Sequence, residues 1–114
     1  METLQRIKDR ELPFYRIYTS NYIIDEAVTH VLYDTGRHDL AVKVLDLIEK
    51  SRAVEVLWVS PEIEGKARDV FRKYVDQIFS FTDCTSFVLM ETYSINTAFT
   101  FDSNFKTYGF NMIP

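Results

Sequence analysis

The chain has 114 residues and a mass of 13.4 kDa, a size that predicts a single domain over residues 1–114. Hydrophobic residues make up 46% of the chain and charged residues 26%, which excludes a disordered chain and a bundle of membrane spans. The net charge of −4 argues against a broad basic surface for non-specific binding of nucleic acid. Any contact with nucleic acid is therefore expected to be local or metal-mediated.

The cysteine content and the N-terminal sequence bear on the cellular compartment. Cys84 is the only cysteine, so an internal disulfide and a cysteine-based zinc site are excluded, and a reducing environment is expected. The first residues carry charges throughout, and no stretch has the length of a signal peptide or a membrane span. We therefore expect a cytoplasmic protein without membrane contact.

The first part of the chain is predicted to contain a helix, a strand and a second helix. Residues 4–10 have a helix-like pattern that ends before Pro13. The β-branched and aromatic residues of 14–19 predict a strand. Ser20 is a suitable N-cap for an amphipathic helix that Gly36 ends.

The middle of the chain continues this alternation of helices and strands. A second amphipathic helix precedes residues 54–59, which read as a largely buried strand. Ser60 and Pro61 are suited to the N-cap and first position of the next helix. The apolar stripe of the helix before the strand consists of Leu40, Val44, Leu47 and Ile48.

The last part of the chain is predicted to contain one helix and two short strands. The helix covers residues 82–93, a strand covers 97–101, and 110–113 predict an edge strand. Strands separated by helices imply parallel crossover connections. The expected fold is therefore an α/β three-layer sandwich with helices on both faces of a central sheet.

Three acidic residues lie where ligands bind in such folds, beyond the carboxyl ends of the strands. Glu26 is in the second turn of the helix after the first predicted strand, Asp83 is at a helix start, and Asp102 closes a strand. Neighbouring carboxylates without a basic partner suit a hard cation such as Mg²⁺ or Mn²⁺. The three residues are therefore candidate ligands of a catalytic metal ion.

Each acid also has a purely structural interpretation, which the spacing alone favours. Glu26 precedes His30 by four residues on one helix face. Asp83 closes the segment 80–83, which resembles a capping box. Asp102 suits an Asx turn.

The segments around these acids resemble the PIN domain family. Residues 79–90, FSFTDCTSFVLM, together with 98–105, AFTFDSNF, and 108–110, YGF, are similar to the carboxyl-terminal half of that family. Upstream, 18–27, YTSNYIIDEA, is similar to the family segment that carries its second acid, which falls here on Glu26. The match is to the metal-dependent ribonucleases that include VapC-type toxins.

This resemblance implies a PIN-like sandwich with a central, mainly parallel sheet and a toxin-type endoribonuclease activity. Mg²⁺ or Mn²⁺, held by Glu26, Asp83 and Asp102, would activate water to hydrolyse RNA phosphodiester bonds. Thr82 and Ser86 would then orient a water or a substrate phosphate, although capping and helix packing also explain them. Besides RNA, the implied partner is an antitoxin-like protein.

One feature of the family has no counterpart in the sequence. The family begins with an apolar strand that ends in Asp followed by Thr or Ser, and this Asp is its first metal ligand. The chain is therefore expected to be N-terminally truncated relative to the family. Loss of a central strand leaves backbone groups unpaired, so we expect rearrangement or a homo-oligomer. We also expect residues 1–114 alone to cleave RNA weakly or not at all.

Two other functions remain open. The first is a catalytically incompetent PIN-like module that acts by self-association or by binding an antitoxin or RNA. The second is a phosphate-receiver domain, although Lys106 follows Asp102 too loosely for the lysine that such a domain needs.

Cys84 and a basic run have simpler interpretations. Cys84 is expected to be a packed core thiol rather than a nucleophile, because no histidine lies near it in the sequence. A run of basic residues is interpreted as a solvated helix face, with contact to RNA phosphates as the alternative; it comprises Lys66, Arg68, Arg72 and Lys73.

Overall fold

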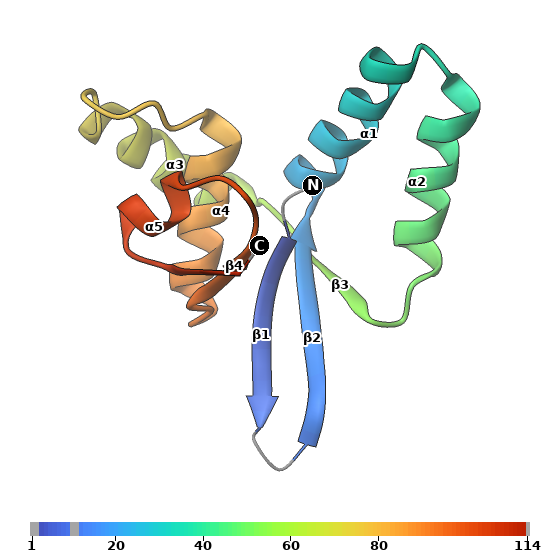
Figure 1. The fold of residues 1–114 in the computed structure, drawn as a ribbon. Helices are drawn as coiled ribbons and strands as arrows, with labels where there is room; N and C mark the ends of the chain where they lie inside the picture. Colours follow the sequence, from blue (N-terminus) through green and yellow to red (C-terminus); the bar gives the residue numbers. More distant parts are fainter. Residues whose placement is uncertain (1–2, 10–11, 114) are drawn as a thin grey trace.

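The computed structural model describes residues 3–9 and 12–113, and side chains from residue 17 to residue 113. Strands and helices alternate along this part of the chain (Figure 1). In order, they are β1 (Thr3–Asp9), β2 (Leu12–Ser20), α1 (Asn21–Thr35), α2 (His38–Lys50), β3 (Val54–Leu57), α3 (Pro61–Lys73), α4 (Phe81–Thr92), β4 (Thr97–Phe99), α5 (Asn104–Tyr108) and β5 (Asn111–Ile113).

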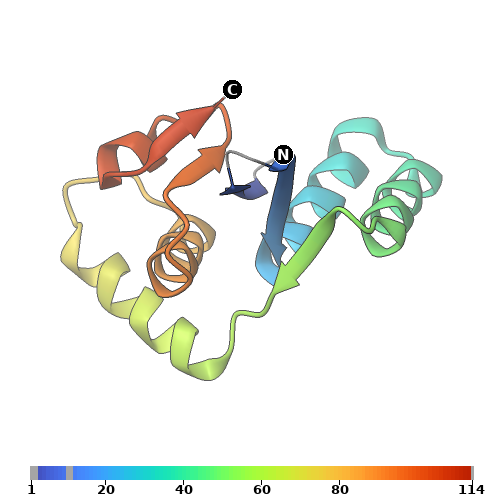
Figure 2. The same ribbon diagram turned by 90° about the horizontal axis from the view of Figure 1, so that it is seen from below.

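The strands form one sheet in the order β3-β2-β1-β4-β5. The pairs β2–β3 and β4–β5 are parallel, whereas β1 is antiparallel to both β2 and β4. Every described strand except β1 therefore runs in the same direction. Helices α1 and α2 lie on one side of the strands, and α3 to α5 lie on the other (Figure 2). The predicted α/β sandwich with a mainly parallel sheet is confirmed.

The helix predicted over residues 4–10 is wrong, because residues 3–9 form the central strand β1. Leu4 is paired with Tyr18 of β2 and with Ala98 of β4. An extended segment in this position pairs the backbone groups of both neighbouring strands, which outweighs a weak local helix preference. The neighbouring strands that we expected to be unpaired are therefore paired. Residue 10 lies outside the described residues.

The other predicted elements are present, with shifts at their ends. Ser20 caps α1 by accepting a hydrogen bond from the amide of Ile23 at 3.1 Å, and Gly36 ends the helix with a φ of 65°. The strand predicted over 54–59 ends at Leu57, its only fully buried residue. It is less buried than predicted because it is an edge strand, covered by a neighbour on one side only.

Aromatic side chains form the core between α3, α4 and α5. Phe87 of α4 is fully buried. Its ring stacks on Tyr108 at a centroid distance of 4.3 Å, and meets the Phe105 and Phe79 rings edge-on at 5.0 and 5.1 Å. Such contacts add to the free energy gained by burying the rings. This cluster holds α5, and with it the loop after β4, against α4.

The helical hairpin α1–α2 is less well covered. Within its described residues, only Ile23 and Ala41 are buried. The hairpin lies beside β2 and β3, away from the aromatic core (Figure 1). Among the residues that the structure describes, no helix has the length and apolar character needed to cross a membrane.

Candidate functional site

Asp83 is the third residue of α4 and is 5% exposed. Its Oδ2 accepts a hydrogen bond from the Ser80 amide at 3.1 Å, and its own amide donates to Ser80 Oγ at 3.0 Å. The predicted capping box is therefore present. It fixes the Asp83 carboxylate at the N-terminus of α4, where the helix dipole favours negative charge.

Asp102 lies in the loop between β4 and α5. Its Oδ1 accepts a hydrogen bond from the amide of Asn104 at 2.9 Å, so the predicted Asx turn is also present. The Asn104 side chain donates to Asp83 Oδ2 at 3.4 Å and to the carbonyl of Ile78 at 2.9 Å. Asn104 thus links the two acidic segments. This role of Asn104 was not predicted from the sequence, because an Asn near a helix start has an ordinary local explanation.

Glu26 belongs to α1, which contacts α4. Loss of solvent raises the pKa of Glu26, the negative charges of Asp83 and Asp102 raise it further, and His30 acts in the opposite direction. Burial also raises the pKa of Asp83, and the negative charge of Asp102 raises it further. The hydrogen bonds from Ser80 and Asn104 lower it. The three carboxylates therefore lie within electrostatic range of one another.

The basic groups near the site are engaged elsewhere. His30 Nε2 lies 2.9 Å from Asp34 Oδ2 on the exposed side of α1. In the described part of the chain, none of Glu26, Asp83 and Asp102 forms an ion pair with a lysine or arginine. Within residues 17–113, their mutual repulsion is therefore not offset by a paired lysine or arginine side chain.

The donor chemistry of this cluster fits a hard cation, but not a closed metal cage. Among the side chains that the structure describes, residues 17–113, no three His, Cys, Asp or Glu groups lie close enough together to hold a metal ion directly. Mg²⁺ usually retains several waters and binds through one or two carboxylates. The cluster fits such an ion, held partly through its water shell.

The two predicted substrate-binding hydroxyl residues differ in their surroundings. Thr82 is half-buried, and its carbonyl accepts a hydrogen bond from Thr85 Oγ1 at 2.6 Å. Ser86 is fully buried one turn after Asp83, and its Oγ has no hydrogen-bond partner within the described residues. An unpaired buried hydroxyl costs roughly 1–3 kcal/mol, so packing alone does not explain a serine there.

Cys84 is fully buried, as expected of a core thiol. Burial, with a smaller contribution from the charge of Asp83, raises the pKa of the Cys84 thiol to about 11. The thiol therefore stays protonated at pH 8, whereas in the unfolded chain it is partly ionised. We expect a chromogenic disulfide reagent to react with the folded protein roughly a hundredfold more slowly than with the urea-unfolded chain. Equal rates would contradict the packed-thiol interpretation.

The basic run of α3 is largely engaged with acids of the same helix. Lys66 lies 3.7 Å from Glu62, Arg68 lies 2.5 Å from Glu64, and Arg72 lies 3.5 Å from Asp69. The ammonium group of Lys73 lies 5.4 Å from the ring centroid of Tyr74, the C-cap residue of α3. These contacts support the interpretation as a solvated helix face.

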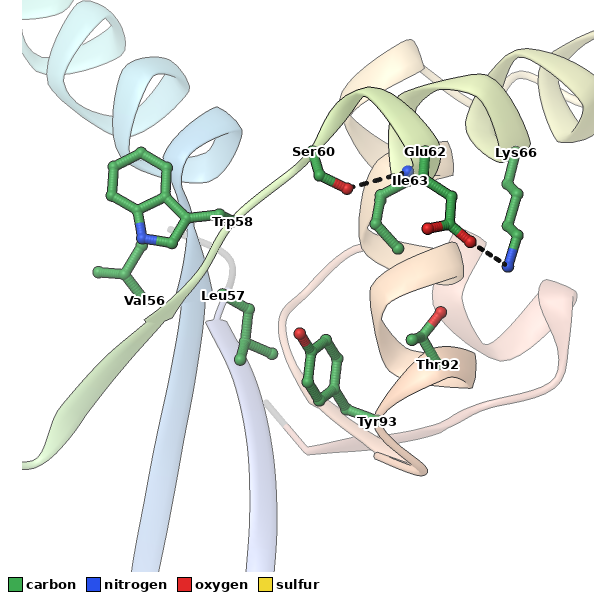
Figure 3. A pocket seen from close by; sticks show the side chains of 9 residues that line it. All are labelled: Val56, Leu57, Trp58, Ser60, Glu62, Ile63, Lys66, Thr92 and Tyr93. Atoms are coloured by element: carbon green, nitrogen blue, oxygen red, sulfur yellow. Dashed lines mark hydrogen bonds and ion pairs between the residues drawn. The ribbon is translucent and has the colours of Figure 1, made fainter.

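A hollow of about 390 Å³ lies between the end of β3, the start of α3 and the end of α4. Figure 3 shows the Leu57 and Tyr93 side chains facing each other across it, with the Trp58 ring turned away from Tyr93. None of the three acids lines it. This hollow was not predicted from the sequence, because residues from three separate elements form it.

Comparison with known proteins identifies the family. The PIN domain description matches residues 1–111, and the chain belongs to the PIN domain family. It is 32% identical over 94 residues to a Mycobacterium tuberculosis protein named 23S rRNA-specific endonuclease VapC20, covering 82% of this chain and 70% of the relative. It is 31% identical over 92 residues to an Archaeoglobus fulgidus protein named VapC ribonuclease, covering 80% of this chain and 56% of that relative.

A solved structure supports the same assignment. The fold is similar to the crystal structure of Mycobacterium tuberculosis VapC20, described as a Sarcin-Ricin loop cleaving toxin, with a TM-score of 0.76 and 32% identity. The similarity covers 82% of this chain and 70% of that one. The resemblance inferred from the acidic segments is therefore confirmed at the level of the family. The assignment to the PIN family replaces the alternative of a phosphate-receiver domain, for which Lys106 was the candidate lysine.

Proposed function

We propose that this PIN domain is a toxin-type endoribonuclease that depends on Mg²⁺ or Mn²⁺, with Glu26, Asp83 and Asp102 holding the ion. The observation that carries the proposal is the carboxylate cluster. Burial and mutual repulsion raise the pKa of Glu26 and Asp83, and no lysine or arginine of the described residues is paired with them. The names of the VapC relatives support RNA as the substrate.

The residues of the chain have distinct roles in this proposal. The capping box with Ser80 fixes Asp83, and Asn104 keeps the Asp102 loop beside it. Thr82 and Ser86 flank Asp83 and orient a water or a substrate phosphate. When bound, the ion supplies activation of water for attack on the scissile phosphate and neutralises charge there.

The proposal extends to partners and location. An antitoxin-like protein is the proposed partner of a toxin-type nuclease, and a homo-oligomer is the proposed assembly. The location that we propose is the cytoplasm, because the one cysteine, Cys84, is a free thiol.

A second candidate function is a catalytically incompetent PIN-like module that acts by self-association or by binding an antitoxin or RNA. One observation favours it: within the described residues, no three of the His, Cys, Asp and Glu side chains come close enough to hold an ion together. Metal binding therefore discriminates between the two functions.

Calorimetric titration with Mn²⁺ tests the proposed metal site. We expect the protein to bind Mn²⁺, and Glu26→Gln and Asp102→Asn each to weaken this binding by about tenfold or more. Asp69→Asn is the matched control, because Asp69 is exposed on α3 and pairs with Arg72; it should leave binding unchanged. If the protein binds no Mn²⁺, the nuclease proposal fails and the module takes its place.

A further inference from the structure

Two of the most exposed apolar side chains belong to the backbone segments that lead into Asp83 and Asp102. Phe101 directly precedes Asp102 and is 84% exposed, and Ile78 is 92% exposed. Asn104 connects their surroundings, because its side chain donates both to the Ile78 carbonyl and to Asp83 Oδ2, while its amide donates to Asp102 Oδ1. Both apolar side chains are therefore carried by segments that are tied to the acids.

The electrostatics of this region disfavour RNA binding through phosphates alone. The chain has a net charge of −4, and carboxylates surround the proposed cleavage site. Lys66, Arg68 and Arg72 already pair with acids of α3. Contacts that do not depend on positive charge therefore add affinity beyond what phosphate binding at the proposed ion supplies. Stacking of a nucleobase on an aromatic ring is such a contact, because every base has an aromatic face.

We propose that Phe101 is a stacking platform for an unpaired RNA base next to the scissile phosphate, with Ile78 as a second apolar contact. The inference rests on the proposed nuclease function and adds a substrate-binding residue to its site. Phe101 directly precedes Asp102 in the chain, so a base stacked on its exposed ring lies close to the loop that carries this carboxylate. The substrate class that fits is single-stranded or looped RNA, whose bases are free to stack.

Binding of a fluorescently labelled single-stranded RNA octamer, measured by anisotropy in EDTA and low salt, tests the platform apart from cleavage. We expect Phe101→Ala to weaken binding roughly 5- to 150-fold, the range for loss of one base stack. Phe101→Trp should bind like the parent. The control is Tyr93→Ala, because Tyr93 is a partly exposed aromatic residue at the opposite end of α4 from Asp83. It should leave the affinity unchanged.

A set of octamers, each lacking the base at a different position, shows which base stacks on Phe101. We expect one abasic position to weaken binding to the parent protein and to have no further effect on Phe101→Ala. The proposal is overturned if Phe101→Ala binds the intact octamer as the parent does, which is the result expected of a surface for a protein partner. It is also overturned if the variant is as sensitive as the parent to every abasic position.

Failure of the platform can be separated from failure of the nuclease proposal. If Asp83-dependent cleavage is present and Phe101→Ala binds RNA normally, only the platform is wrong. If Phe101→Ala loses RNA affinity and no divalent ion supports cleavage, only the nuclease proposal is wrong. Thermal melts should show that Phe101→Ala is folded, because the ring is almost fully exposed.

Discussion

Asp83→Asn is expected to lower the rate of divalent-ion-dependent RNA cleavage by about a hundredfold or more, because it removes one charge from the site and lets the ion shift. The substitution is nearly isosteric, and the Asn side-chain oxygen can still accept the hydrogen bond from Ser80. The start of α4 should therefore be retained. Single-turnover cleavage of a short RNA with protein in excess and Mn²⁺ present is the appropriate measurement, because it reports the cleavage step without product release.

Two controls support the interpretation of this experiment. Asp69→Asn removes an acidic charge from the surface of α3 and should cleave as the parent does. Addition of EDTA should abolish cleavage by the parent. If Asp83→Asn cleaves as fast as the parent, Asp83 is not part of the catalytic site. If the parent itself does not cleave, the binding-module function replaces the nuclease for this chain.

Phe87→Ala is expected to lower the free energy of unfolding by about 3–5 kcal/mol, the usual cost of deleting a buried ring. Phe87 is fully buried and contacts the rings of Phe79, Phe105 and Tyr108. The variant therefore loses both buried apolar area and aromatic contacts. Urea denaturation followed by far-ultraviolet circular dichroism measures the change. Since small domains are stable by only about 5–15 kcal/mol, the variant is expected to be partly unfolded at 37 °C.

A milder substitution keeps this test informative if Phe87→Ala does not fold. Phe87→Leu retains most of the volume and should be destabilised less than Phe87→Ala. Phe101→Ala is the matched control, because it removes an exposed ring; its free energy of unfolding should change by less than about 0.5 kcal/mol. A loss for Phe101→Ala equal to that for Phe87→Ala would contradict the assignment of the core.

Helix ends were predictable because their signals are local. Ser20 and Ser60 accept hydrogen bonds from amides three residues later, and Gly36 has the positive φ that ends a helix. The strand β1 was not predictable in this way. Its conformation depends on pairing with β2 and β4, and residues 97–99 of β4 lie far away in the sequence. A local pattern in residues 4–10 contains no information about that pairing.

The candidate site was predictable in its acids but not in their connections. The capping role of Asp83 and the turn role of Asp102 follow from neighbours within three residues, and both are present. The link through Asn104 depends on how α5 packs against α4, and the complete burial of Ser86 depends on tertiary packing around α4. Such packing results from the aromatic cluster, whose members are spread from α3 to the segment after α5.

The position of β1 between β2 and β4 has a consequence for folding during synthesis. Of the described strands, β1 and β2 leave the ribosome before the others, so their hairpin can form before the rest of the sheet. The other side of β1 finds its partner only when residues 97–99 have emerged. One side of β1 therefore stays unpaired in the nascent chain until residues 97–99 have emerged, and long-range pairing of this kind slows folding. Chaperones that bind exposed strand edges are therefore expected to assist folding mainly during this interval.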